Sequence, residues 1–140
     1  MKYILQGFLF LLTFEKNQSM ILSILSFLFI SFGYSLFEKL KDKKGYTAFL
    51  THHLKQTKYA NLFWWLLVFI NTFTSLILII GIFSTLFNFY LFSPVIIYKT
   101  CVLNILILLF GQRIAGDFQG AANLGIYLIL TILGWYLQVQ

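Results

Sequence analysis

Charged side chains are scarce in this sequence, and their scarcity excludes most classes of protein. Only 10% of the 140 residues are Asp, Glu, Lys or Arg, whereas about 25% are charged in a typical soluble domain. Between Lys58 and Lys99, 40 consecutive positions carry no charge. As a helix this run would measure about 60 Å, roughly twice the hydrocarbon thickness of a bilayer. The chain is therefore expected to lie in a membrane and to turn back once within the run.

Cysteine, acidic residues and metal-binding patterns are also nearly absent. Cys101 is the sole cysteine, so no disulfide can form within the chain. His52 and His53 are adjacent and cannot share a helix face, and no third ligand is near them in sequence, so no metal site is expected. No residue cluster specifies a reaction, so no catalytic residue is predicted. The net charge of +6 comes without a nucleic-acid motif, which indicates attraction to anionic headgroups instead.

What the chain does contain is apolar sequence sufficient for about four membrane spans. Hydrophobic residues make up 60% of it, and the mean hydropathy is +0.87. We expect an all-α fold, an integral membrane four-helix bundle formed by residues 20–140. The apolar run from Tyr3 to Phe14 is too short to cross a bilayer, at about 18 Å as helix. Residues 1–19 are therefore predicted to form a hydrophobic N-terminal segment, a partial or interfacial helix; a cleaved leader and a strained full span are the alternatives.

The first span is predicted from Met20 to Phe37. Small side chains repeat along one of its faces and would permit close helix contact, so this face is expected to pack inward. A polar path lined by serine hydroxyls is the alternative. The residues concerned are Ser19, Ser23, Ser26 and Gly33.

A basic loop follows the first span and sets the expected topology. Six lysines occur between Glu38 and Lys58, against two acidic residues. Because an excess of Lys and Arg in short loops marks the cytoplasmic side, loop 38–61 is predicted to be cytoplasmic in a multi-pass protein of the bacterial inner membrane. Within the loop, the apolar spacing predicts an amphipathic surface helix from Gly45 to Lys58.

The second and third spans carry the polar residues of greatest interest. The second span is predicted from Leu62 to Ile82, with Asn71 and Ser75 on one face near mid-depth. A turn at residues 82–85 would give a long, kinked third span over residues 86–110 with Lys99 near its middle, and this turn is favoured. A turn at residues 93–94 is the alternative, with Lys99 near the outer end. In the favoured case Asn71, Ser75 and Lys99 line an intramembrane polar pocket; otherwise Lys99 extends to the interface.

The fourth span is predicted from Ala121 to Leu137. Before it, Arg113 and Asp117 are spaced four residues apart, which fits an interfacial ion pair, and Asp117 is also placed to cap the following helix. Small residues around the start of this span predict close packing against a neighbouring helix. They are Gly116, Gly120, Ala121 and Gly125.

The second span also resembles a known family. The run Asn71-Thr-Phe-Thr-Ser75-Leu-Ile-Leu78-Ile-Ile-Gly81 is similar to the E-x-x-x-G-x-x-L-x-x-G pattern of DoxX-like membrane proteins, with Leu78 and Gly81 matching. Asn71 stands at the glutamate position and Ser75 at the first glycine. The stretch from Phe32-Gly33 to Lys39-Leu40 resembles the glycine-then-lysine exit from the family's first span. The resemblance implies a four-helix bundle in the bacterial inner membrane, in a family named for a subunit associated with quinone-linked thiosulfate oxidation.

Three functions remain open from the sequence. The first is a DoxX-like accessory or structural subunit beside a larger membrane complex, with no cofactor. The second is a quinone-linked redox enzyme subunit, with quinone bound in a cavity among Asn71, Lys99, Arg113 and Asp117. The third is a small transporter, channel or holin-like protein, for which more intramembrane charge is expected. The expected partners are the bilayer, its anionic headgroups and either another membrane protein or a second copy, and no nucleic acid.

Overall fold

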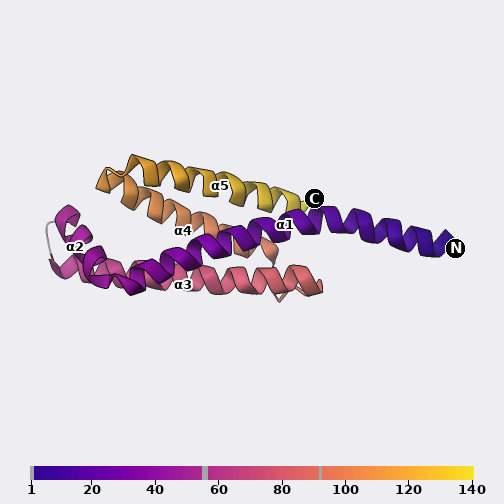
Figure 1. The fold of residues 1–140 in the computed structure, drawn as a ribbon, viewed down its shortest axis with the longest axis horizontal. Coiled ribbons are helices and arrows are strands. Elements are labelled where there is room, and N and C mark those ends of the chain that lie inside the picture. The colour runs from indigo at the N-terminus through magenta and orange to yellow at the C-terminus, as the bar shows by residue number, and fades with distance from the viewer. Residues whose placement is uncertain (1, 55–56, 92) are drawn as a thin grey trace.

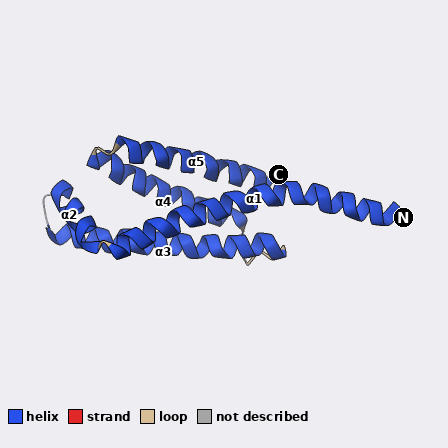
Figure 2. Ribbon diagram, viewed as in Figure 1, coloured by secondary structure: helices blue, strands red, loops and turns tan. Residues whose placement is uncertain are grey.

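The computed structural model is built from helices alone in the part of the chain that it describes. That part comprises residues 2–54, 57–91 and 93–140, with side chains described for residues 17–53, 59–91 and 93–140. Five helices follow one another in this order (Figure 2): α1 (Lys2–Lys41), α2 (Lys43–Leu54), α3 (Thr57–Phe87), α4 (Pro94–Ala115) and α5 (Phe118–Val139).

Four helical segments are long and apolar enough to cross a bilayer. Their mean hydropathies lie between 1.5 and 2.5, and each needs only about 20 residues to span the hydrocarbon. The predicted all-α membrane fold is therefore confirmed, and each predicted span overlaps one of these segments, although the third begins at Pro94 instead of residue 86. The segments are Asn17–Lys41, Tyr59–Phe87, Pro94–Ala115 and Phe118–Val139.

The four long helices lie side by side as a bundle (Figure 1). Contacts join α1 to α3, α3 to α4, α4 to α5, and α5 back to α1, while α2 packs on α3. In Figure 1, α2 and the α4–α5 turn lie at one end of the bundle, whereas the C-terminus and the α3–α4 turn lie at the other. We call the first the basic end, because it holds Lys39, Lys41, Lys43 and Lys44.

The N-terminal segment continues directly into the first span. α1 is one helix of 40 residues from Lys2 to Lys41, and its N-terminal part extends beyond the ends of the other helices in Figure 1. The division expected at residue 19 does not coincide with a break in this helix. A separate interfacial position of residues 1–19 stays a prediction.

The surface helix expected from Gly45 to Lys58 corresponds to α2. It begins two residues earlier, at Lys43, and ends at Leu54. Residues 55 and 56, which the prediction placed in its last turn, lie outside the described part of the chain. Lys58 belongs to α3 instead.

The turn between the second and third spans is not where we expected it. α3 continues to Phe87 and α4 begins at Pro94, so the turn favoured at residues 82–85 is wrong and the alternative at residues 93–94 is correct. The N–H of the first residue in a helix has no partner within that helix. Proline, which lacks an N–H, therefore loses no hydrogen bond at this position. Asn88 has a φ of 50°, and asparagine is one of the few residues that tolerate this left-handed conformation. Because Pro94 lies at the start of α4, it does not interrupt the hydrogen bonds in the interior of this helix.

The core of the bundle is mainly apolar and draws on every long helix, including α5 through Leu124. Leu25, Leu28 and Leu78 are almost fully buried, as are Tyr98 and Ile105. Many large apolar side chains are exposed instead, which is expected of helices that face lipid. The core therefore holds the bundle together near its axis, while its outer surface suits the hydrocarbon.

The arrangement sharpens the topology prediction. The lysine-rich loop and the α4–α5 turn share one end of the bundle. Because the lysines predict a cytoplasmic loop, the α4–α5 turn should be cytoplasmic as well. We expect alkaline phosphatase, which is active only outside the cytoplasm, to be active when fused after Gln140 and inactive when fused after Ala48. The reverse pattern would overturn the assigned orientation.

Candidate functional site

Two amides meet in the middle of the bundle. Asn104 on α4 donates from Nδ2 to Oδ1 of Asn71 on α3, at 3.0 Å, and to Oγ1 of Thr74, also at 3.0 Å. Asn71 is 0% exposed and Asn104 1% exposed. Because hydrocarbon offers no hydrogen-bond partners, polar groups at this depth must find them in the protein. These bonds therefore tie α3 to α4.

The hydrogen-bonded chain continues from Asn71 toward the basic end. Nδ2 of Asn71 donates to Oγ of Ser35 on α1, at 3.3 Å. Nζ of Lys39 donates to the same hydroxyl and to the main-chain carbonyl of Ser35, at 3.3 Å for the carbonyl. We call these side chains the polar network: Lys39, Ser35, Asn71, Asn104 and Thr74.

Lys39 is the charged member of the network and is only 1% exposed. Its main-chain carbonyl accepts a hydrogen bond from Nε1 of Trp64 at 3.1 Å. Its Nζ lies 5.2 Å from the centroid of the Tyr46 ring, a distance at which a cation is attracted to an aromatic face. α2 thus covers a lysine that the sequence places in a solvated loop.

A cavity of about 300 Å³ adjoins the network at the basic end, between α1, α2, α4 and α5. Burial, and then the nearby charge of Glu38, raise the pKa of the Tyr46 hydroxyl above its ordinary value, so this group stays protonated and can donate into the cavity. We call it the Lys39 cavity. Its main polar lining residues are Ser35, Glu38, Lys39, Tyr46, Gln112 and Asn123.

The pocket predicted from Asn71, Ser75 and Lys99 is formed only in part. Asn71 and Ser75 are buried, but Lys99 is exposed, so the structure does not place its ammonium with them. Lys99 lies in the second turn of α4, about 7.5 Å along the axis from Pro94. From there its long side chain can reach the interface, as the alternative described.

Asn104 takes the place expected for Lys99, and sequence reasoning missed it. It is an amide within a run of apolar residues, and it lies near the middle of α4, at a depth comparable to that of Asn71. If the third span had been predicted to begin at Pro94, Asn104 would have been recognised as a polar residue near the middle of a membrane span. Of the other buried polar atoms in the described residues, Ser75 Oγ, Tyr98 OH and Asn104 Oδ1 have no partner.

Arg113 and Asp117 lie at the α4–α5 turn on the protein surface. Asp117 caps α5, because its Oδ1 accepts from the backbone N–H of Gly120 at 2.9 Å. The Arg113 guanidinium lies 5.4 Å from the Phe118 ring centroid and forms no ion pair with Asp117 in the described structure. Gly116 has a φ of 73° and ends α4, which requires the conformational freedom of glycine.

The small residues expected to pack inward mostly do not. Ser19 and Ser23 are exposed, and Ser26 and Gly33 are half-buried. Among the described residues, and apart from the local backbone of the same helix, no heavy atom lies within 4 Å of the position that a Cβ would take at Gly33 or at Gly125. Of the four small residues named around the start of α5, only Ala121 is buried, although a Cβ at Gly120 would lie 3.0 Å from Cδ of Gln112 on α4. α1 instead turns inward its large apolar residues, Leu25, Leu28 and Phe32.

Close helix contacts occur at two other glycines. A Cβ at Gly81 on α3 would lie 2.9 Å from Cδ1 of Ile97, and a Cβ at Gly134 on α5 would lie 2.9 Å from Cε1 of Tyr98. Small residues therefore do permit close packing in this bundle, at Gly81 and Gly134. Neither was singled out for packing from the sequence.

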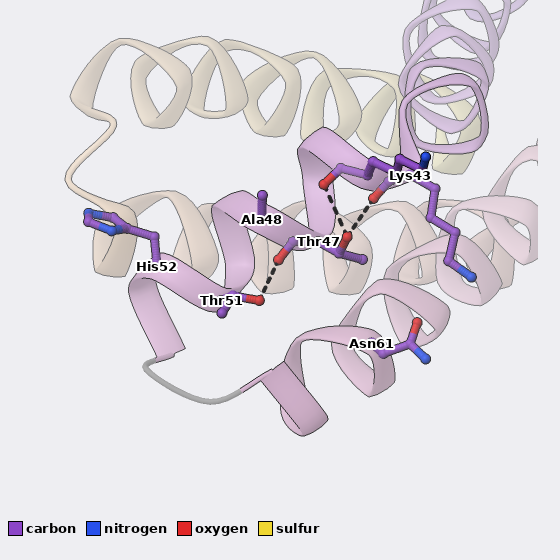
Figure 3. A pocket seen from close by; sticks show the side chains of 7 residues that line it. Lys43, Thr47, Ala48, Thr51, His52 and Asn61 are labelled. Carbon is purple, nitrogen blue, oxygen red and sulfur yellow. Dashed lines mark hydrogen bonds between the residues drawn. The ribbon is translucent and has the colours of Figure 1, made fainter.

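A shallow groove of about 860 Å³ lies between α2 and the start of α3 (Figure 3). The Thr47 hydroxyl donates to the carbonyls of Lys43 and Lys44, and the Thr51 hydroxyl donates to that of Thr47. His52 and Asn61 lie on different sides of the groove in Figure 3. Among the described residues, no three His, Cys, Asp or Glu side chains are grouped to hold a metal ion. The hydroxyls of Thr47 and Thr51 are thus already engaged within α2.

Comparison with protein-family models, with curated proteins and with solved structures returned no match. The helix lengths and their apolar composition indicate a multi-pass membrane protein that contacts the lipid bilayer. The chain is a small all-helical protein with four candidate membrane-spanning helices and a polar network between three of them.

Proposed function

We propose that this protein is a structural accessory subunit that packs beside a partner in a larger membrane complex. The observation that carries the proposal is the open space beside Gly33 on α1 and Gly125 on α5. A glycine within a helix costs about 0.8–1 kcal/mol relative to alanine. Neither glycine is used for packing within the described part of this chain, so a helix from another protein is the natural occupant of the space.

The physical basis is the way helices associate in lipid. Lipid tails are as apolar as leucine, so association depends on van der Waals contact, which small residues increase by letting backbones approach. Gly81 and Gly134 serve this purpose inside the bundle, and Gly33 and Gly125 offer the same kind of surface outside it. Ser19, Ser23 and Ser26 extend the surface along α1.

From the resemblance of the second span, we further propose a DoxX-like protein of the bacterial inner membrane. Asn71, Ser75, Leu78 and Gly81 all lie on the buried face of α3. The quinone-linked alternative needs Asn71, Lys99, Arg113 and Asp117 around one cavity. In the structure Asn71 is buried within the bundle, whereas the other three residues are exposed, so this alternative loses support.

Copurification tests the proposal. A tagged protein extracted from its native membrane in mild detergent should retain a stoichiometric membrane-protein partner. Gly33→Leu and Gly125→Leu should each reduce the retained partner at least about tenfold, which corresponds to about 1.4 kcal/mol of lost binding free energy. Their thermal unfolding should match that of the wild type, because neither site packs against another helix in the described part of the chain.

Thr100→Leu is the matched control, since Thr100 is half-exposed on α4 and its hydroxyl bonds only within its own helix. This variant should keep the partner. Absence of any partner from the wild type, or full retention by both glycine variants, would refute the proposal. Recovery of a second copy of the chain alone would replace the accessory role with a homo-oligomer.

A further inference from the structure

We infer that the Lys39 cavity is a binding site for a phosphate group at the basic end of the bundle. The inference goes beyond the accessory role, and it rests on the charge, the free donors and the depth of the cavity.

The first observation is a buried ammonium without an anionic partner. In the described structure, the groups in contact with Lys39 Nζ are the hydroxyl and carbonyl of Ser35 and the ring of Tyr46, and all are neutral. Removing a charge from water costs several kcal/mol unless an opposite charge compensates it. Glu38 lines the same cavity but is exposed and forms no ion pair with Lys39 in the described part of the chain. A ligand with a negative charge would supply the missing compensation.

The second observation is a set of unused donors around the same space. The side chains of Tyr46, Gln112 and Asn123 line the cavity from α2, α4 and α5. Among the described residues, none of them donates a hydrogen bond to another protein group. Phosphate oxygens are acceptors only, and they bind best to several N–H and O–H donors together with a cation. The cavity volume of about 300 Å³ is sufficient for such a group.

The third observation is the depth of the cavity. Lys39 lies two residues before the end of the span Asn17–Lys41, and Gln112 lies three residues before the end of α4 at Ala115. The cavity therefore lies at the level of the headgroups. Lys41, Lys43 and Lys44 are exposed at the same end and would raise the local concentration of anions. The phosphate can thus come from an anionic lipid or from a free phosphorylated compound.

Thermal unfolding of the full-length protein in nanodiscs tests the site. The nanodiscs contain phosphatidylcholine alone, phosphatidylcholine with added phosphatidylglycerol, or phosphatidylcholine with inorganic phosphate at constant ionic strength. A ligand that binds only the folded state raises the Tm, so phosphatidylglycerol, phosphate or both should raise the wild-type Tm by several degrees. Lys39→Gln should lose more than half of this rise.

Two further variants keep the test decisive. Asn123→Leu removes a lining donor from an exposed position, so it should fold normally and still lose part of the rise, even if Lys39→Gln does not fold. Lys41→Gln removes an exposed charge outside the cavity and should keep most of the rise. A response to phosphatidylglycerol alone identifies a lipid headgroup, and a response to phosphate identifies a free ligand. No response in the wild type, an undiminished response in Asn123→Leu, or an equal loss in Lys41→Gln would overturn the inference.

Discussion

Gly134→Leu should strongly destabilise the bundle, whereas Gly125→Leu should leave its stability nearly unchanged. At Gly134 even a Cβ would lie 2.9 Å from Cε1 of Tyr98 and 3.0 Å from Cγ2 of Ile24. Tyr98 is fully buried, so its ring cannot move aside, and α5 would have to move away from α1 and α4. Overpacking of this kind costs about 1–3 kcal/mol, and the bulk of leucine places the expected loss at the upper end.

Gly125 is the matched control, because it lies on the same helix and, among the described residues, no other helix comes within 4 Å of the position of its Cβ. Thermal unfolding of both variants in the same detergent measures the difference. Gly134→Ala should show a smaller loss of stability in the same direction. Equal unfolding temperatures for Gly134→Leu and Gly125→Leu would mean that α5 does not pack against Tyr98.

Asn71→Leu and Asn104→Leu should each destabilise the bundle, and their effects should not add. Each single change removes the bond between the two amides, worth about 0.6–2 kcal/mol for an interhelical bond in hydrocarbon, and leaves the other amide with one partner fewer. The double variant leaves neither amide unpaired, so the coupling free energy should be at least about 0.5 kcal/mol. Equilibrium unfolding of the four proteins in one detergent gives this value.

Lys99→Met is the control for this comparison of single and double variants. Lys99 is exposed, whereas Asn71 is buried, so Lys99→Met combined with Asn71→Leu should give additive changes in stability. Coupling between Lys99 and Asn71, with additivity between the two asparagines, would show that the helices are rotated differently about their axes.

The sequence by itself determined the membrane fold and the features that act over a few residues. The run without charge from Tyr59 to Tyr98 required two crossings. The free energy of membrane insertion is a sum over the residues of each apolar segment, so it can be read from the sequence without knowing which helices pack together. The cap formed by Asp117 on Gly120 was equally accessible, since a side chain at the N-cap bonds backbone groups within three residues of itself. The turn at Pro94 depends on the same local rules, and it was missed only because a longer, kinked helix was preferred.

Only the tertiary structure decided which side chains face one another. In a soluble protein the apolar face of a helix reveals its inward side, but in lipid both sides are apolar, so the sequence did not show that α1 buries Leu28 and leaves Gly33 open. The partnership of Asn71 with Asn104 depends on the rotation of α3 and α4 about their axes. Lys39 belongs to a basic loop by its sequence, and it becomes a buried charge because α2 packs on α3 and brings Tyr46 over it.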